Sequence, residues 1–441
     1  MSNQQHATTI LRALRDARFE AYFVGGCVRD LLLGREPADY DVTTNATAQQ
    51  VMSLFPETYA VGAQFGVVLV PSADKNATVE VATYRSDVSY SDGRHPDAVR
   101  FSQTAREDVE RRDCTINGLL LDPISNEVLD YVGGRDDLKA KIIRTIGEAD
   151  RRFGEDKLRM LRAVRFAARF GYTIEPATFH AIQKLASQIH QVSRERIADE
   201  LNKMLTEGRA RRAFELLDET GLLAQVLPEI AAMKGVAQPP EYHPEGDVWI
   251  HTLMLLGGLP AGCSRTLAWG ALLHDVGKPP TFRVAPDRIR FDGHVEVGMK
   301  MAEEICRRLR FSNHDTEQIL ALIEHHMRFG HVLRMKESTL KKFLRLPFFE
   351  EHLELHRLDC LASHRDLSHY EFMREKLATI PPEVMRPAPL ITGDDLIAAS
   401  YLPGPRFKEI LAAVEDAQLE GKLSTTTAAL EFVRQQFPQS G

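Results

Sequence analysis

The sequence predicts an α+β protein, in which a head with a small mixed β-sheet is followed by regions that are entirely helical. Strand-like runs, rich in β-branched and aromatic residues, are confined to the first third of the chain. After about residue 135 the apolar residues recur at helical spacing almost throughout. No internal repeat and no low-complexity tract interrupts this order. These observations favour several compact domains over a repeat protein.

The head elements follow one another with clear punctuation. Gly, Asn, Asp and Pro separate four strand-like runs, and helices are expected before and after the first run. Pro-rich breaks at 238–244 and 381–389 mark two further boundaries. The predicted strands lie at 22–25, 40–42, 67–70 and 78–84, and the helices at 7–18 and 28–33. We expect a head over 1–140, a helical neck and body over 141–237, a second helical domain over 238–375 and a helical tail over 376–441.

Length and composition bound the class of protein. A chain of 441 residues fits roughly two to four domains, and 44% hydrophobic with 27% charged residues is typical of a soluble globular protein. No apolar stretch approaches the ~18 residues needed to cross a bilayer, and the N-terminus lacks a signal-peptide pattern. The five cysteines form no CxxC pair. We therefore expect a cytoplasmic protein with reduced thiols and no membrane partner.

Charge is distributed unevenly along the chain. The net charge of −7 excludes a uniformly basic polyanion binder. Residues 139–212 nevertheless carry 17 Lys/Arg against 9 Asp/Glu, a local balance of +8 that leaves −15 for the remainder. This segment is a candidate surface for a polyanion such as RNA, and a solvated helix face is the alternative.

The segment Gly25-Gly26-Cys-Val-Arg29 is neither a P-loop nor a dinucleotide-binding turn. Two glycines between a strand and a helix still allow close backbone approach to a phosphate, and the helix start offers N–H donors. Arg29 adds a fork of donors one turn into the helix. This pattern indicates a cradle for a triphosphate.

Asp39 and Asp41 follow this segment in a predicted strand. Residues i and i+2 of a strand project from one face, so the two carboxylates converge there. Such a pair suits Mg²⁺ and metal-assisted phosphoryl transfer. A turn with solvated aspartates is the alternative, and the glycine–arginine element just upstream favours the metal site.

Residues 25–47, GGCVRDLLLGREPADYDVTTNAT, resemble the signature of the class II tRNA nucleotidyltransferase/poly(A) polymerase family. Two further motifs follow in the family's order: 111–117 (RRDCTIN) resembles RRDxTIN, and 155–159 (EDKLR) resembles EDxxR. The likeness covers about the first 230 residues. It implies a polymerase-β-like nucleotidyltransferase head that uses Mg²⁺, held by Asp39 and Asp41, to act on tRNA with CTP and ATP.

The resemblance also implies roles for residues beyond the carboxylate pair. Arg112 would contact the nucleotide phosphates and Asp113 the ribose hydroxyl. Glu80, on a neighbouring predicted strand, is a further acidic candidate, with a cross-strand charge partner as the alternative. We expect Asn117 to be structural. Gly25, Gly26 and Arg29 complete the expected nucleotide contacts.

A helix expected to begin near Glu155 explains how a nucleotide is selected without a nucleic-acid template. Asp156 and Arg159, at i and i+3, would share one helix face and present acceptors and donors to a base edge. The family uses this pair to read cytosine and then adenine, with Glu155 orienting the arginine. Arg162 and Arg165 would then bind the triphosphate. A solvated arginine stripe is the alternative.

The polar segment 87–97 occupies the place of the family's flexible loop, which is needed for the switch from C to A addition. It looks complete here, which disfavours an enzyme that adds only CC.

The second domain carries the pattern H…HDxGK, formed by His251, His274 and Asp275, with His294, His325 and Asp359 downstream. This pattern resembles the HD phosphohydrolase superfamily. Imidazoles and carboxylates on facing helices indicate a site for a divalent transition metal, with His251, His274, Asp275 and Asp359 as ligands. Buried structural histidines are the alternative.

The leading functional hypothesis is template-independent CCA addition to tRNA 3′ ends. An A-adding enzyme and a poly(A) polymerase share the head motifs and remain alternatives, although the HD pattern disfavours the second. From another class, the chain would be an HD phosphohydrolase whose head only binds RNA. The intact Asp39/Asp41 pair weighs against that alternative, and against a scaffold without activity.

Overall fold

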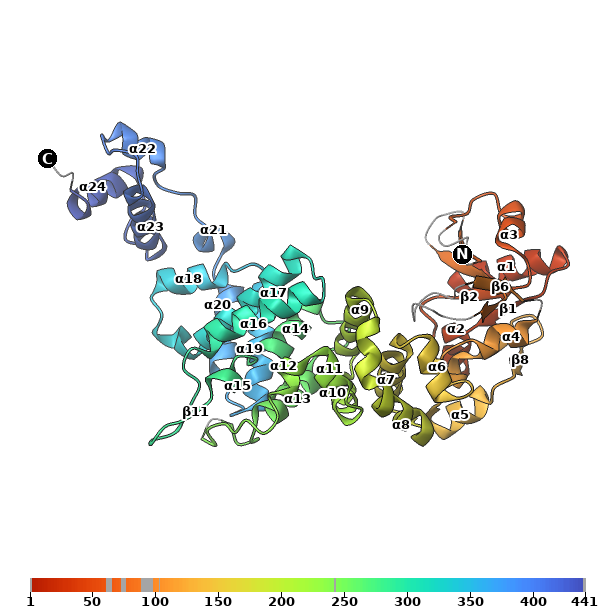
Figure 1. The fold of residues 1–441 in the computed structure, drawn as a ribbon. Coiled ribbons are helices and arrows are strands. Elements are labelled where there is room, and N and C mark those ends of the chain that lie inside the picture. The colour runs from red at the N-terminus through yellow and green to blue at the C-terminus, as the bar shows by residue number, and fades with distance from the viewer. Residues whose placement is uncertain are drawn as a thin grey trace. The chain divides into compact units, whose positions relative to one another are not determined.

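The computed structural model describes residues 2–60, 66–72, 77–88, 98–102, 104–241 and 243–438 (Figure 1). The chain divides into two compact units. The first holds Met1–Ala231 with Pro260–Gly262 and Arg308–Arg310, and the second holds Ala232–Leu259, Cys263–Arg307 and Phe311–Gly441. The finer division of the sequence into four segments remains a prediction.

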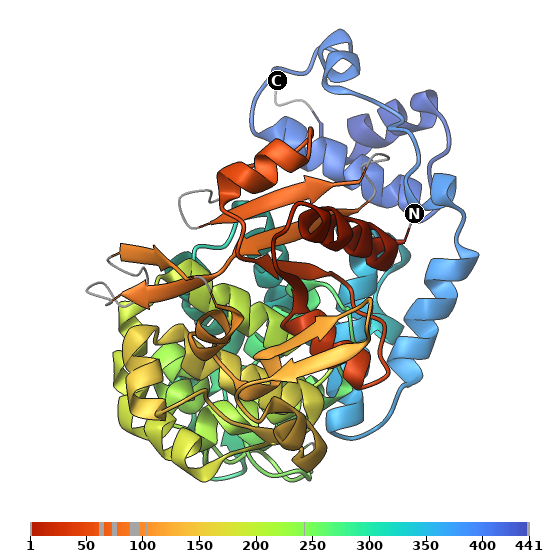
Figure 2. The same cartoon turned by 90° about the vertical axis from the view of Figure 1, so that its right-hand side faces the viewer.

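A six-stranded sheet forms the centre of the head, with the strand order β3-β4-β2-β1-β7-β8 (Figure 2). Strands β2 and β4 pair in parallel, whereas the other neighbours pair antiparallel. The sheet is therefore mixed, which confirms the predicted fold class. Its strands are β1 (Ala21–Val24), β2 (Asp41–Thr44), β3 (Val67–Pro71), β4 (Thr78–Thr83), β7 (Leu119–Asp122) and β8 (Glu127–Asp130).

Side-chain alternation is clearest in β4, one of the central strands of this sheet. In β4, Val79 and Val81 are buried while Glu80 between them is exposed. Helix α1 (Asn3–Asp16), capped by Ser2, contacts β1, β2 and β4 and buries Ile10 and Leu14. Each such side chain contributes roughly 1.5–3 kcal/mol through its removal from water. This packing therefore fixes β1, β2 and β4 relative to one another.

Strands β7 and β8 were not expected from the sequence, nor was the pair β5 (Arg85–Val88) and β6 (Ala98–Phe101). The run Leu119–Leu121 consists of leucines, which are apolar but not β-branched, and such a short run does not separate a buried strand from a buried helix. One further short pair, β9 (Ile142–Ile143) with β10 (Thr173–Ile174), lies in the region that was expected to be helical.

Helices form the rest of the first unit. Helix α7 (Leu158–Phe170) is its centre, because it packs against α9 and α10 and buries Met160, Leu161 and Val164 completely. The other helices are α2 (Gly26–Leu32), α3 (Ala48–Leu54), α4 (Ala105–Glu110), α5 (Gly134–Ala140), α6 (Ala149–Glu155), α8 (Pro176–Leu185), α9 (Arg194–Thr206), α10 (Ala210–Glu219), α11 (Leu222–Val226) and α12 (Pro228–Ala231), with 3₁₀ turns η2 (Thr115–Asn117) and η3 (Ala186–Gln191).

Among its described residues, the second unit is helical apart from the hairpin β11 (Arg283–Val284) and β12 (Ile289–Arg290) and an isolated bridge between Ala237 and Asp247. Helix α14 (Arg265–Leu273) packs against α13, α17 and α19 and buries all of its residues except the first, Arg265. This packing fixes the His-Asp pair that follows the helix. The other elements are α13 (Val248–Gly258), α15 (Lys278–Thr281), α16 (His294–Arg308), α17 (Asn313–His325), η4 (His326–Arg334), α18 (Glu337–Leu344), α19 (Phe349–Ala362), α20 (Ser368–Thr379), α21 (Pro382–Met385), α22 (Gly393–Ala398), α23 (Arg406–Leu419) and α24 (Thr426–Gln436).

The C-terminal helices α22–α24 have an apolar core of their own, which includes Leu396, Ile410, Val414 and Val433. Across the ranges described above, no helix is both long and apolar enough to cross a membrane.

Candidate functional site

A polar cavity of about 770 Å³ lies in the first unit. Eleven of the twelve site residues predicted for the head line it, and only Glu155 does not. Its wall carries nine basic and five acidic side chains, a balance suited to a polyphosphate. The basic ones are Arg29, Arg111, Arg112, Arg159, Arg162, Arg165, Arg169, Arg196 and Lys203, and the acidic ones are Asp39, Asp41, Glu80, Asp113 and Asp156.

Three carboxylates line part of this cavity. Asp41 is the first residue of β2 and stands in register with Glu80 of the parallel strand β4. Burial, reinforced by the negative charge of Glu80, raises the pKa of Asp41 to about 6, although Arg112 opposes the shift. The expected strand 40–42 is displaced: β2 begins at Asp41, and Asp39 lies exposed in the segment before it. These oxygen donors suit a hard divalent cation, which would relieve their repulsion.

The glycine turn shapes the wall beside these carboxylates. Gly25 has a φ of +75°, which favours glycine, and a Cβ there would lie 3.3 Å from Nη1 of Arg112. Arg29 is buried, and its Nη1 donates to Oδ1 of Asn117 at 2.6 Å. Its Nε donates to Asp30 at 2.9 Å, while burial lowers the pKa of Arg29. Asn117 therefore fixes the arginine in the wall.

A buried carboxylate that the sequence analysis missed holds two arginines. Asp108 is fully buried on α4, and its Oδ1 accepts from Arg111 at 2.7 Å while its Oδ2 accepts from Arg112 at 3.1 Å. Burial alone would raise the pKa of Asp108, but the two guanidinium groups hold it below its usual value. The i,i+3 and i,i+4 spacing from Asp108 to these arginines was the available signal.

Asp113 precedes the 3₁₀ turn η2 and is bonded to Arg162 of α7. Its Oδ2 accepts from Nε of Arg162 at 2.7 Å, and its Oδ1 accepts from the Cys114 N–H at 2.7 Å. Burial would raise the pKa of Asp113, yet Arg162 holds it well below its usual value. The same contact raises the pKa of Arg162. Asp113 is thus an ionised anchor that faces the cavity.

The expected single helix from Glu155 was wrong. Glu155 ends α6, Asp156 is extended with a φ of −144°, and α7 begins at Leu158. Asp156 breaks the helix because its Oδ1 accepts from the Leu158 N–H at 3.0 Å, a local bond that competes with helix continuation. Asp156 and Arg159 nevertheless line the same cavity.

The side chains at this break are tightly held. Oε2 of Glu155 accepts from Nη1 of Arg159 at 2.8 Å and from Nη1 of Arg152 at 2.8 Å. Nη2 of Arg159 donates to the carbonyl of Arg111 at 2.9 Å. Asp156 accepts from both terminal nitrogens of Arg196, at 2.8 and 3.3 Å. The base-reading role of this pair stays a prediction.

Helix α9 supplies the partners of the α7 arginines. Arg165 is buried, and its Nε donates to Oε2 of Glu200 at 2.6 Å. Nη1 of Arg162 lies 3.8 Å from the other Glu200 oxygen. Arg196 and Lys203, also on α9, join the cavity wall. The sequence analysis missed these α9 residues, although they lie within the basic segment 139–212. Of the predicted flexible loop, residues 89–97 lie outside the described residues.

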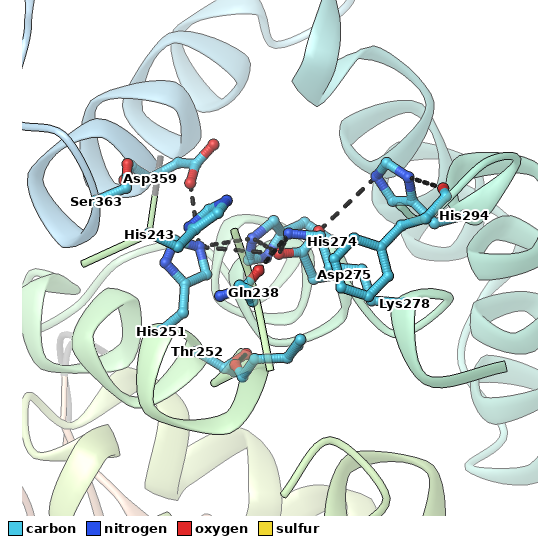
Figure 3. Close-up of polar contacts among 12 residues, drawn as sticks. Gln238, His243, His251, Thr252, His274, Asp275, Lys278, His294, Asp359 and Ser363 are labelled. Atoms are coloured by element: carbon cyan, nitrogen blue, oxygen red, sulfur yellow. Dashed lines mark hydrogen bonds and ion pairs between the residues drawn. The ribbon is translucent and has the colours of Figure 1, made fainter. Parts of the chain in front are cut away.

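A second candidate site lies in the second unit, where residues from α13, the end of α14 and α19 converge (Figure 3). Nε2 of His251 lies 3.1 Å from Asp359 and 3.4 Å from Nε2 of His274. Nε2 of His274 lies 3.2 Å from Oδ2 of Asp275. The four predicted ligands are therefore brought together. Burial would lower the pKa of His251, but hydrogen bonds to Asp359 and Glu245 raise it to about 9.

A second group of ligand atoms adjoins the first. The buried Oδ1 of Asp275 lies 3.9 Å from Nε2 of His294 and 3.9 Å from Nε2 of His326, and within the described part of the chain these three atoms have no hydrogen-bond partner. His325, named from the sequence, instead contacts Phe343 and His352. The helix α17 ends at His325, and the 3₁₀ turn η4 that follows directs His326 to the cluster.

Other polar residues surround this cluster and were not foreseen. Nζ of Lys278 donates to Asp275 at 2.7 Å and to Gln238 at 2.7 Å. Glu245 accepts from Nδ1 of His251 and of His243. A cavity of about 410 Å³ adjoins the site, and its wall includes Arg288 and Arg290 of the β11–β12 hairpin. The arrangement can hold divalent metal and admit an anionic substrate.

Three sequence families match parts of this chain. Residues 21–144 match the family described as poly A polymerase head domain. Residues 171–234 match the probable RNA and SrmB-binding site of polymerase A, and residues 248–346 match the HD domain.

Individual proteins are also similar to this chain. The CCA-adding enzyme of Geobacillus stearothermophilus is 44% identical over 227 residues, which are 52% of this chain and 55% of that enzyme. That of Bacillus subtilis is 42% identical over 220 residues, 50% of this chain and 55% of that enzyme. The matched region thus spans about half the length of these curated relatives.

Solved structures extend the likeness over nearly the full chain. The CCA-adding enzyme of Bacillus stearothermophilus in complex with CTP gives a TM-score of 0.76 at 27% identity and covers 99% of both chains. The Thermotoga maritima CCA-adding enzyme complexed with tRNA shares the fold, with a TM-score of 0.59 at 18% identity over 97% of this chain and 94% of that one.

Proposed function

We propose that this chain, which belongs to the tRNA nucleotidyltransferase/poly(A) polymerase family, adds CCA to tRNA 3′ ends from CTP and ATP. The observation that carries the proposal is the head cavity, which combines the carboxylates Asp39 and Asp41 with an arginine-rich wall and the Asp156/Arg159 pair. The activity of similar proteins supports the same conclusion, since both curated relatives named above are CCA-adding enzymes.

The reaction is an in-line attack of the RNA 3′-hydroxyl on the α-phosphate of the nucleoside triphosphate, with pyrophosphate leaving. Asp39 and Asp41 would hold Mg²⁺, whose charge stabilises the attacking and leaving oxygens when it is bound. Arg112, Arg162 and Arg165 bind the triphosphate. The cavity orders these arginines in advance through their bonds to Asp108, Asp113 and Glu200, so positioning costs little entropy at the moment of binding.

Selection of the nucleotide falls to Asp156 and Arg159. A carboxylate and a guanidinium offer acceptors and donors to the Watson–Crick edge of cytosine or adenine. Glu155 fixes the Arg159 guanidinium at 2.8 Å, and Arg196 fixes Asp156, so that both groups hold one orientation. Asp113 and the glycine turn at Gly25 and Gly26 border the same space and would contact the ribose and phosphates.

The test offers three RNAs with CTP and ATP, singly and together: tRNA that ends before C74, tRNA that lacks only A76, and unrelated RNA. We expect products that stop at CCA. Addition of A alone to the CC end would identify an A-adding enzyme, and long tails on any RNA would identify a poly(A) polymerase. Either result would contradict the proposal.

The five free cysteines and the tRNA substrate together support a cytoplasmic location.

The second unit supports a second activity. We propose that His251, His274, Asp275 and Asp359 bind a divalent transition metal, and that His294 and His326 extend the site. The three partnerless buried atoms around Asp275 fit a cation, because burying polar atoms without partners is costly. The metal would supply a Lewis acid and activate water for phosphoester hydrolysis. Release of inorganic phosphate from phosphate monoesters, lost in His274→Ala, tests this activity.

A further inference from the structure

Glu245 stands behind the metal-site histidines and has no role in the functions proposed above. It lies in the segment before α13, and its side chain is 4% exposed. Its Oε1 accepts from Nδ1 of His251 at 2.7 Å and from Nδ1 of His243 at 2.9 Å. One carboxylate oxygen therefore serves two imidazole rings, which meet edge to face with centroids 5.0 Å apart.

This contact has a direct consequence for ligation. A histidine binds metal through a ring nitrogen that carries no proton, and the proton must then sit on the other nitrogen. In the structure Nδ1 of His251 faces Glu245, whereas Nε2 faces Asp359 and His274. A carboxylate accepts hydrogen bonds and donates none when ionised. Glu245 thus holds the proton on Nδ1, so that Nε2 is the nitrogen that gives up its proton when a metal replaces the contact to Asp359.

We propose that Glu245 is the positioning residue that fixes His251 in its metal-binding tautomer and ring orientation. The proposal rests on the metal site proposed for the second unit. The same carboxylate oxygen also holds His243, which lines the adjoining cavity. Outer partners of this kind typically account for 10- to 100-fold in metal affinity.

Glu245→Gln is the sharpest variant, because the amide has nearly the same shape. Its single carbonyl oxygen is a weaker acceptor than a carboxylate, and its amide nitrogen can donate to Nδ1 and favour the wrong tautomer. We expect Co²⁺ affinity at the second unit to fall about 10- to 100-fold. The thermal midpoint of the metal-free variant should match that of the parent, which separates a positioning role from a folding defect.

The titration uses the full-length chain in an Asp39→Asn/Asp41→Asn background, so that metal bound in the head does not contribute. Co²⁺ absorption reports both affinity and ligand geometry. Glu241→Gln, an exposed glutamate on the same segment, is the matched control. His243→Ala keeps the Glu245–His251 bond and should retain affinity within a few-fold.

Three results are decisive. Unchanged Co²⁺ affinity in Glu245→Gln would overturn the proposal. A changed Co²⁺ band pattern at saturation would also overturn it, because Glu245 would then be a ligand. A third result would refute the proposed metal site instead of the positioning role: the parent binds no Co²⁺, or His251→Ala and His274→Ala bind Co²⁺ as tightly as the parent does.

Discussion

The Glu155 carboxylate accepts a 2.8 Å hydrogen bond from the Arg159 guanidinium across the break between α6 and α7. A second donor, Arg152, shares the same carboxylate oxygen, and the Arg111 carbonyl accepts from the other end of Arg159. The arginine is therefore held at both ends before any nucleotide binds. Because Glu155 helps to fix the Arg159 guanidinium without lining the cavity, nucleotide selection by Arg159 should depend on Glu155 as well.

Arg159→Ala should abolish selection of CTP and ATP over the other nucleotides. One bidentate contact to a base is worth roughly 1–3 kcal/mol, or about 5- to 150-fold in discrimination. Single-nucleotide incorporation with each of the four triphosphates measures this ratio. Arg211→Ala, on the exposed face of α10, is the control. Unchanged selectivity in Arg159→Ala would defeat the assignment.

Asp41→Asn and Asp39→Asn should each remove nucleotide transfer while largely sparing RNA binding. Metal-ion stabilisation of a phosphoryl transition state amounts to several kcal/mol, so we expect losses of about 1,000-fold. Rapid-quench assays measure transfer, and gel shifts with tRNA measure binding. Loss of both together would point to misfolding instead of a missing metal ligand.

Breaking the buried pair Arg165–Glu200 should destabilise the first unit. Its side chains are 6% and 3% exposed, and removing the Glu200 charge leaves the buried Arg165 only the longer contact to Glu207, at 3.6 Å. We expect Glu200→Gln to cost about 3–5 kcal/mol in urea unfolding. Glu215→Gln removes an ion pair with the exposed Arg211 and should cost at most about 1 kcal/mol. Equal costs would contradict this interpretation.

His352 should make the second unit sensitive to acid. It is buried, and within the described residues neither ring nitrogen has a hydrogen-bond partner. Burial, with the nearby charges of His325 and Arg328, lowers the pKa of His352 to about 4. In the unfolded chain His352 has its ordinary pKa of about 6.5, so it is protonated at a higher pH there than in the folded protein. The stability that His352 contributes above about pH 6.5 is therefore lost as the pH falls towards 4.

The stability lost through His352 should reach roughly 3 kcal/mol, at about 1.4 kcal/mol for each pH unit. His352→Phe should remove this part of the pH dependence. Urea midpoints at pH 7, 5.5 and 4.5 test the difference, with the exposed His314→Phe as the control. Parallel curves for parent and His352→Phe would disprove the assignment.

The two proposed activities should separate by mutation. Every residue of the head cavity lies in the first unit, and every residue of the metal cluster lies in the second. His251→Ala should therefore abolish phosphate release and leave CCA addition within two-fold, as an order-of-magnitude expectation for an independent site. Asp41→Asn should do the reverse. A joint loss in either variant would refute their independence.

Local pattern was enough to predict part of this protein. Alternating β-branched residues located β4, and the motif resemblance located most of the head cavity. Contacts between distant helices were not predictable, because an acidic residue such as Glu200 looks like any surface glutamate until α9 meets α7. The choice between His325 and His326 depended on where a helix becomes a 3₁₀ turn, and the break at Asp156 on a local side-chain bond. Neither leaves a clear mark in apolar periodicity.

Asp108 is a buried carboxylate that balances the charges of two arginines in the head. It binds Arg111 and Arg112, and it also accepts from the hydroxyl of Thr43, which lies in β2 two residues after Asp41. Asp108 therefore connects two arginines of the cavity wall to the strand that begins at Asp41. A substitution of Asp108 should therefore loosen two cations and a strand together, although Asp108 does not itself line the cavity.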